Sequence, residues 1–227
     1  ARGIGGTGND RGFNLSLDSQ VKIYITGDFV GTVSFGGISI SSGGSPGFFI
    51  AKYDNDGNAL WAKSPSGSGQ SVSYGVAVDA ASNCYVTGYF GGGPVTFGNV
   101  TLTAAFQDVF VAKYDTAGNF LWVRQGNGIP AEGAGIAVDG SGNVYVTGYF
   151  NVSATFGAVT LSAVGPHGVF VVKYDTSGNL VWAKRGTAGN YDEGMGIVVD
   201  GSGNSFVTGD IDSVTHAIGN LLVAKYD

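Results

Sequence analysis

The chain alternates short apolar runs with turns that are rich in Gly, Asn and Asp. Between residues 135 and 185, the apolar runs are 135–139 (GIAVD), 144–150 (VYVTGYF), 169–175 (VFVVKYD) and 180–185 (LVWAKR). Val, Ile, Phe, Tyr, Thr and Trp dominate these runs, and these residue types favour β-strands. No helical period of 3.6 residues occurs along the chain. The pattern therefore predicts four short strands over these ranges.

The turns between these runs indicate how the strands pair. Two of them share the pattern Asp-x-x-Gly-Asn, at 139–143 and 175–179. The Asp side chain can accept hydrogen bonds from the backbone of such a turn, and Gly and Asn tolerate positive φ. Turns of this kind connect neighbouring strands as hairpins, so we predict an antiparallel sheet.

The predicted strands carry apolar side chains on both faces. In the run 144–150, Val144 and Val146 lie on one face, while Tyr145 and Tyr149 lie on the other. A strand from a sheet with one solvent-exposed face would alternate apolar and polar residues instead. We therefore expect each small sheet to lie between two others, which is the arrangement of blades in a β-propeller. A β-solenoid is the alternative, but its repeats are usually shorter and lack paired hairpins.

The same unit occurs four times along the chain. The tripeptide Lys-Tyr-Asp recurs at 52–54, 113–115, 173–175 and 225–227, and the glycine of a Thr-Gly pair recurs at Gly27, Gly88, Gly148 and Gly209. These glycines are 61, 60 and 61 residues apart. We therefore predict a single β-propeller domain over residues 1–227, with repeat units of approximately 1–54, 55–115, 116–175 and 176–227.

The predicted fold class is all-β, a β-propeller of four repeated four-stranded antiparallel blades. The blades form either a closed four-bladed ring or a four-blade fragment of a larger propeller. In a closed ring we expect residues 1–4 to pair with 221–226, because unpaired strand edges are costly. The fourth unit is shorter and lacks the Phe-Gly element found at 35–36, 97–98 and 156–157. We predict that this element forms an extra hairpin between strands two and three.

Several segments of the repeat match a known pattern. In the third unit they are 135–139 (GIAVD), 142–148 (GNVYVTG), 170–175 (FVVKYD) and 178–183 (GNLVWA), with equivalents in the other units. The units resemble the bacterial β-propeller repeat known as SBBP and, more distantly, the NHL-type propeller repeat. The resemblance implies a propeller fold. It implies no catalytic residues, because that family is recognised by structural positions.

Composition and charge limit the classes of partner. Glycine accounts for 41 of the 227 residues, only 12% of residues are charged, and the net charge is −6. Such a chain is poorly suited to nucleic acid or to an anionic membrane surface, and no apolar run approaches the ~18 residues of a membrane helix. Cys84 is the only cysteine, which excludes an internal disulfide framework. We expect an extracellular or cell-surface protein of bacterial origin.

Few residues indicate catalysis or metal binding. His167 and His216 do not recur in register and are predicted to lie in solvated loops, and Cys84 is predicted to be a small packed thiol. Asp54, Asp56 and Asn58 place oxygen-bearing side chains at alternate positions of one turn, which makes this turn a calcium candidate. A plain turn is the favoured interpretation. We predict no metal, no other cofactor and no catalytic constellation.

Two repeated features are predicted to be structural. Trp61, Trp122 and Trp182 recur in register and are expected to pack in the core, with stacking on a glycan as the alternative. Lys-Tyr-Asp recurs in every unit, so we expect it to serve the same strand end in each blade. An active site would need an asymmetry that these repeats do not offer.

The connections that differ between units mark the predicted ligand face. Function usually lies on variable loops that a rigid frame carries. The polar and aromatic residues there are Asp10, Arg11, Gln70, Tyr74, Glu132, Tyr191, Asp192 and Glu193. We predict a non-enzymatic binding or structural scaffold module whose partner is an unidentified protein or glycan, or a second copy of the chain. A carbohydrate-binding or carbohydrate-active propeller is the alternative, although a hydrolase would need an acid pair that the sequence does not locate.

Overall fold

The computed structural model describes residues 3–186, 191–211 and 220–227, and the strands in these residues form five antiparallel sheets. The first unit of the fold is a four-stranded sheet in the order β2-β3-β6-β7, and its fourth strand lies beyond residue 54, so each of the first three units takes its last strand from the start of the next predicted repeat. The strands of the first unit are β2 (Arg11–Leu17), β3 (Ile23–Phe29), β6 (Gly47–Tyr53) and β7 (Ala59–Lys63). The predicted strand pattern and antiparallel pairing are confirmed.

The second and third units repeat this order and share one larger sheet. The second unit contains β9 (Gln70–Val78), β10 (Cys84–Gly91), β13 (Gln107–Tyr114) and β14 (Phe120–Asn127), and the third contains β15 (Ala131–Val138), β16 (Val144–Phe156), β17 (Val159–Tyr174) and β18 (Leu180–Arg185). A short pairing of β14 with the end of β16 joins the two units. The fourth unit is a three-stranded sheet of β19 (Glu193–Val199), β20 (Ser205–Ile211) and β21 (Asn220–Tyr226).

The extra hairpin between strands two and three is present as predicted. It consists of β4 (Thr32–Phe35) and β5 (Ile38–Ser41) in the first unit, of β11 (Val95–Phe97) and β12 (Val100–Leu102) in the second, and of the extended ends of β16 and β17 in the third. Two short strands lie just before the first main strand of a unit. In the first unit β1 (Gly5–Gly6) pairs with β4, and in the second unit β8 (Ser66–Gly67) pairs with β11. Each of these two hairpins thereby becomes a three-stranded sheet.

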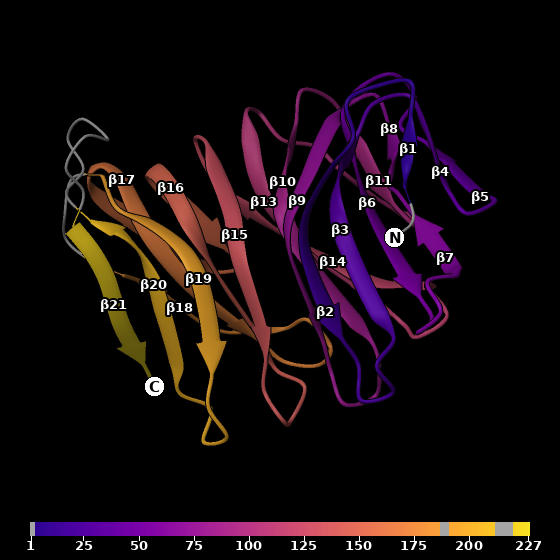
Figure 1. The fold of residues 1–227 in the computed structure, drawn as a ribbon. Coiled ribbons are helices and arrows are strands. Elements are labelled where there is room, and N and C mark those ends of the chain that lie inside the picture. Colours follow the sequence, from indigo (N-terminus) through magenta and orange to yellow (C-terminus); the bar gives the residue numbers. More distant parts are fainter. Residues whose placement is uncertain (1–2, 187–190, 212–219) are drawn as a thin grey trace.

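The units form an open array in the part of the chain that the structure describes. Figure 1 shows β21 at one end and β1, β4, β5 and β7 at the other, with the two chain ends on opposite sides. Among the described residues, β21 pairs only with β20, while β1 pairs with β4. Within residues 3–186, 191–211 and 220–227 no closed ring is formed, and the expected pairing of 1–4 with 221–226 is absent for residues 3 and 4. Residues 1 and 2 lie outside the described residues.

The Asp-x-x-Gly-Asn turns hold their shape through the Asp side chain. Asp139 Oδ1 accepts the backbone N–H groups of Ser141 and Asn143, both at 2.9 Å, and Oδ2 accepts the Asn143 Nδ2–H at 2.7 Å. The turns that begin with Asp54, Asp79, Asp115, Asp175 and Asp200 repeat these hydrogen bonds. The predicted role of the aspartates is therefore confirmed.

The repeated tryptophans pack between units. Trp122 is 9% exposed, and its Nε1–H donates to the carbonyl of Thr176 in the next unit at 3.2 Å. A Cβ atom on Gly178 would lie 2.8 Å from the Trp122 ring, so only glycine fits beneath it. Trp61 makes the same contact with the next turn, through Thr116. Trp61 and Trp122 therefore pack between units, and their rings are not available for stacking on a glycan.

The repeated lysines lie at the same junctions. Lys113 is 7% exposed, and its Nζ lies 4.0 Å from Asp79, 4.9 Å from the centre of the Tyr85 ring and 3.2 Å from the Thr176 carbonyl. A buried lysine is tolerated where a carboxylate and hydrogen-bond acceptors surround it. The lysine of Lys-Tyr-Asp therefore recurs because it makes the same charged contact at each junction. This contact adds to the role at the strand end that the sequence predicts. No helix in the described residues is long and apolar enough to cross a membrane.

Candidate functional site

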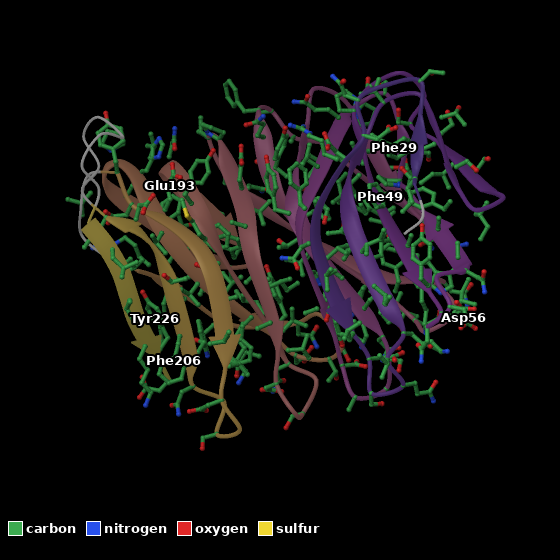
Figure 2. All side chains as sticks on the ribbon, viewed as in Figure 1. Phe29, Phe49, Asp56, Glu193, Phe206 and Tyr226 are labelled. Atoms are coloured by element: carbon green, nitrogen blue, oxygen red, sulfur yellow. The ribbon has the colours of Figure 1, made fainter. Side chains whose placement is uncertain are left out.

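The two ends of the strands differ in character. The Asp-x-x-Gly-Asn turns form one end, and the variable connections form the other. Figure 2 shows Glu193 at the end with the variable connections and Asp56 toward the opposite end. The first strands of successive units are neighbours, with β2 beside β9, β9 beside β15 and β15 beside β19. These four strands therefore bring one end of every unit to a common surface.

A β-bulge in each first strand sends one extra residue toward this surface. The register of the first two strands shifts in every unit, and the residues left unpaired are Phe13, Tyr74, Ala134 and Met195. The glycine of Thr-Gly lies opposite each bulge. A Cβ atom on Gly148 would lie 1.9 Å from the Glu132 carbonyl oxygen, so no other residue fits there. The repeated Thr-Gly pair therefore exists to accommodate the bulge.

One cavity of about 380 Å³ is lined by all four units. Its lining residues are Phe13, Asn14, Tyr74, Glu132, Ala134, Tyr149, Glu193, Gly194 and Met195. All four bulge residues are among them. A pocket of several hundred Å³ with aromatic walls and a few polar groups is typical of ligand sites. This cavity is the candidate functional site.

Aromatic rings form one side of the cavity. Phe13 and Tyr74 meet edge to face with their ring centres 5.1 Å apart, and the ring of Tyr89 lies 6.1 Å from that of Tyr74. Burial raises the pKa of Tyr74 to about 12, and the nearby Glu132 contributes to the shift. The Tyr74 phenol therefore stays protonated and can donate a hydrogen bond at neutral pH.

Two carboxylates also line the cavity. Burial raises the pKa of Glu132, and the charge of Glu193 raises it further, while a hydrogen bond with Tyr149 opposes the shift. Glu193 Oε1 lies 3.1 Å from Nδ1 of His167, whose ring stacks on Tyr149 with centres 5.1 Å apart. The structure thus brings together two acidic side chains that are about 60 residues apart in the sequence.

Histidine 167 differs from its prediction as a solvated loop residue. It lies in β17, its side chain is 20% exposed, and it contacts Tyr149, Tyr191 and Glu193. The long strand β17 carries it to the rim, because in this unit the extra hairpin continues the main strands. His216 lies outside the described residues.

The predicted site residues divide into three groups. Tyr74, Glu132 and Glu193 line the cavity. Two others border it. Arg11 lies 5.2 Å from the centre of the Phe13 ring and forms two hydrogen bonds with Asp28, at 2.6 and 2.9 Å. The Tyr191 ring contacts His167, which in turn contacts the lining residues Tyr149 and Glu193.

The remaining three residues do not join the cavity. Asp10 Oδ2 accepts the backbone N–H of Gly6 at 2.6 Å and stabilises a local turn. Gln70 pairs with Gly91 at the start of β9. Asp192, which immediately precedes β19, is fully buried, whereas the predicted ligand face requires accessible side chains.

Sequence reasoning missed Phe13, Tyr149 and Met195. It searched the variable connections, whereas these residues lie within strands. The available signal was the position 14 residues before the glycine of each Thr-Gly pair, which holds Phe13, Tyr74, Ala134 and Met195 in the four units. A repeat position with four different residues next to repeated neighbours indicates a site that the fold leaves free to vary.

The calcium candidate and the cysteine have local explanations. Asp54 Oδ1 accepts the backbone N–H groups of Asp56 and Asn58, at 3.0 and 2.8 Å, and Oδ2 accepts the Asn58 side chain at 3.0 Å. The turn thus uses both carboxylate oxygens. No cluster of three or more His, Cys, Asp or Glu side chains suitable for a metal occurs in the described residues. Cys84 is fully buried, and burial raises the pKa of its thiol, as expected for a packed residue.

Comparison with known proteins supports the propeller repeat. Residues 121–152 and 181–214 match the SBBP β-propeller repeat, so the predicted resemblance is confirmed for these segments. An uncharacterized WD repeat-containing protein of Acanthamoeba polyphaga mimivirus is 26% identical, over 73% of this chain and 14% of that protein. The chain therefore spans only about one seventh of that relative's length.

Two solved structures show lower similarity. One is a protein of unknown function from Bacteroides caccae, with 13% identity, a TM-score of 0.41, and coverage of 89% of this chain and 58% of that one. The other is a glucose dehydrogenase, with 9% identity, a TM-score of 0.40, and coverage of 97% of this chain and 84% of that one.

Proposed function

We propose, from the SBBP β-propeller repeats that the chain carries, that it is a non-enzymatic binding module built from four propeller blades. The observation that carries the proposal is the cavity to which all four units contribute, each with a different bulge residue. A purely structural repeat would have no need for four different side chains at one repeat position. We propose an extracellular or cell-surface location in a bacterium, and a protein or glycan partner.

The chemistry of the cavity supports binding. Phe13, Tyr74 and Tyr149 offer large rigid surfaces, and Glu132 and Glu193 offer hydrogen-bond acceptors. Aromatic residues contribute much of the contact energy at binding sites, since they bury a large area at a low entropic cost. The net charge of −6 makes nucleic acid a poor partner. The proposal requires no metal or other cofactor.

A carbohydrate ligand is the second candidate. The observation that favours it is that the Phe13 and Tyr74 rings and the Glu132 and Glu193 carboxylates line one cavity. Sugars present apolar C–H faces that pack on aromatic rings and hydroxyl groups that donate to carboxylates. Paired carboxylates also serve glycoside hydrolysis, so a carbohydrate-active role belongs to this candidate.

Two screens test these candidates. The labelled chain is applied to a glycan array, and a displayed peptide library is selected on the wild type with counter-selection on the double variant Tyr74→Ala/Glu132→Gln. Leu121→Ala, at an exposed position on β14, is the matched control. We expect a ligand that binds the wild type and the control but loses at least tenfold in affinity for the double variant. If neither screen yields a ligand that distinguishes these proteins, the cavity is not a binding site.

Release of reducing sugar from any glycan that binds separates the two candidates further. Binding without turnover supports the non-enzymatic module. Turnover that disappears in Glu132→Gln would instead identify a carbohydrate-active protein, and the non-enzymatic proposal would be abandoned.

A further inference from the structure

The cavity shared by the four units holds both glutamates of the chain. Glu132 and Glu193 are the only glutamates in the sequence, and both line this cavity. They occupy the same repeat position, Glu132 in β15 and Glu193 in β19. Aspartates such as Asp139 serve the turns, which need a short side chain. The acidic residues of the cavity therefore differ in type from those that the turns require.

The negative charge of Glu132 is not neutralised by the surrounding protein. Within the described residues, Glu132 forms no ion pair with a lysine, arginine or histidine side chain. Burial raises the pKa of Glu132 and the charge of Glu193 adds to the shift, although a hydrogen bond with Tyr149 opposes it. A ligand with a positive charge would compensate this carboxylate.

The other charged groups around the cavity do not restore the balance. Glu193 Oε1 lies 3.1 Å from His167 Nδ1, but Asp210 lies directly opposite Glu193 in the strand pairing, and like charges in such positions repel each other. Arg11 occupies the same repeat position in the first unit, but its guanidinium already binds both oxygens of Asp28, at 2.6 and 2.9 Å. Among the described residues that line the cavity, none is a lysine or an arginine. The cavity therefore favours a cationic ligand.

Aromatic rings suit the cavity to a cation that carries alkyl groups. Phe13, Tyr74 and Tyr149 line it together with the two carboxylates. The face of an aromatic ring is partly negative and attracts a cation within about 6 Å of its centre, most strongly where water is excluded. Arg11 already makes such a contact, with its guanidinium carbon 5.2 Å from the centre of the Phe13 ring. Rings and carboxylates in one cavity thus provide both parts of a site for an organic cation.

The chain holds its own ammonium groups with the same two elements. Lys52 Nζ lies 4.8 Å from the centre of the Tyr24 ring and 3.7 Å from an oxygen of Asp18. Lys113 and Lys173 repeat this arrangement in the second and third units, where Nζ lies 4.9 and 4.8 Å from the centre of a tyrosine ring. A tyrosine ring beside a carboxylate therefore binds an ammonium group three times within this fold.

A metal ion is a poorer match for the cavity. Calcium takes about six to eight oxygen ligands that converge on one point. The part of the chain that the structure describes contains no group of three or more His, Cys, Asp or Glu side chains that could hold a metal. Aromatic rings would add nothing to such a site, whereas they contact the alkyl groups of an organic cation directly.

We propose that the cavity binds an alkylammonium cation, whose nitrogen lies near the two glutamates and whose alkyl groups pack on the aromatic rings. This ligand class rests on the proposed function, because it requires the cavity to be a binding site. The cavity volume of about 380 Å³ exceeds that of an ammonium group, so the attached alkyl groups can enter with it. Lysine side chains of a partner protein and free quaternary ammonium compounds both carry such groups.

Matched pairs of charged and neutral probes test the proposal. One pair is choline and its analogue in which a carbon atom replaces the nitrogen. The other is lysine blocked at both backbone ends and the same compound acetylated on its side-chain nitrogen. Titration of the purified chain, followed through the backbone amide NMR signals of Tyr74, Ala134 and Gly194, measures each affinity. We expect the charged member of at least one pair to bind about tenfold more tightly than its neutral partner, or better.

Charge-removing variants locate the contact. Glu132→Gln keeps the shape of the side chain, so it should weaken binding of the charged probe about tenfold and leave the neutral probe unaffected. Asp56→Asn is the matched control, because it removes the same charge from an exposed turn toward the opposite end of the strands (Figure 2). The control should bind as the wild type does, which separates a local contact from the effect of net charge. Circular dichroism checks folding, and Glu193→Gln is the second variant for the same measurement.

The outcomes separate the ligand class from the proposed function. Equal affinities within both pairs, or no binding of either charged probe, overturn the alkylammonium ligand. So does a charged probe that binds both glutamine variants as tightly as the wild type. A preference within the lysine pair identifies a protein side chain as the ligand, and one within the choline pair alone identifies a free quaternary ammonium compound.

The glycan array and the peptide library report on the binding module itself. A glycan or an uncharged peptide that requires Tyr74 and Glu132, found for a chain that binds neither charged probe, would leave the binding module intact and overturn the alkylammonium ligand. Failure of the screens and of the probes together would overturn both.

Discussion

The turn end and the cavity end of the strands follow opposite rules. At the turn end, Asp139 and its equivalents make the same hydrogen bonds in unit after unit, and the turns receive the same tryptophan. At the cavity end, the bulge position holds a different residue in each unit. The difference teaches that repetition marks what the fold requires, whereas variation at a fixed repeat position marks a surface that is free to acquire a ligand.

Removal of a junction tryptophan should show the largest effect. Trp122→Ala should lower the free energy of unfolding by about 3–5 kcal/mol, because it empties a buried aromatic site and removes one of the two donors to the Thr176 carbonyl, leaving only Lys113. Urea denaturation measures the loss. Tyr74→Ala at the cavity end is the comparison and should cost less. A loss below about 1 kcal/mol for Trp122→Ala would contradict the junction role of the Trp row.

Loss of a turn aspartate should rank second. Asp139→Ala should lower the free energy of unfolding by about 2–3 kcal/mol, since hydrogen bonds to a charged acceptor are worth more than neutral ones. Burial by itself would raise the pKa of Asp139, but the hydrogen bonds from Asn143 and its neighbours outweigh burial, and the pKa is lowered. The stabilisation is therefore present above the ordinary pKa of Asp and is lost as the pH falls through the lowered value.

A pH series of the unfolding free energy measures this effect. The difference between wild type and Asp139→Ala should shrink on acidification. Asp139→Asn keeps one side-chain oxygen for the turn and should lose less than the alanine variant. A loss for Asp139→Ala that stays constant across the pH series, together with no loss for Asp139→Asn, would show that the carboxylate charge is irrelevant to the turn.

The cavity carboxylate should behave in the opposite sense. Burial raises the pKa of Glu132, so the stability linked to its protonated form is present below the ordinary pKa of Glu and is lost as the pH rises through the raised value. Glu132→Gln should therefore stabilise the protein at neutral pH, by about 1 kcal/mol or less, and leave it unchanged in acid. Thermal denaturation at both pH values measures the change. Destabilisation at neutral pH would mean that the ionised carboxylate supports the fold.

The smallest effect is expected at an exposed bulge position. Met195 is 51% exposed, and Met195→Ala should change the free energy of unfolding by no more than about 0.5 kcal/mol. Its effect should be on ligand affinity alone. Urea denaturation paired with binding of the selected ligand checks this, and a clear loss of stability would place Met195 among the structural positions.

Much of the fold could be predicted from the chain alone. The Asp-x-x-Gly-Asn turns, the strand runs and the extra hairpin at Phe97 follow from local chemistry that is repeated in register. The open arrangement of the units could not be predicted, because the angle between neighbouring units depends on side-chain packing at junctions such as that of Trp61. A repeat count does not determine this angle.

The candidate site was only partly predictable. Tyr74, Glu132 and Glu193 follow the variable connections along the chain and were found through them. Phe13 and Met195 depend on a shift in strand register, which the alternation of apolar and polar residues does not reveal. His167 was misplaced because the third unit continues its hairpin in the main strands, whereas the first and second units break at this point.

The bulge opposite each Thr-Gly pair has a consequence for how such a protein changes over time. Because the glycine absorbs the close approach of the Glu132 carbonyl to Gly148, the ladder on either side remains in register whatever side chain the bulge carries. Duplication of the unit within a gene therefore copies a stable strand pairing together with one position at which the side chain can change. Four such positions can diverge independently around a common cavity, so new specificity can arise without a search for a new fold.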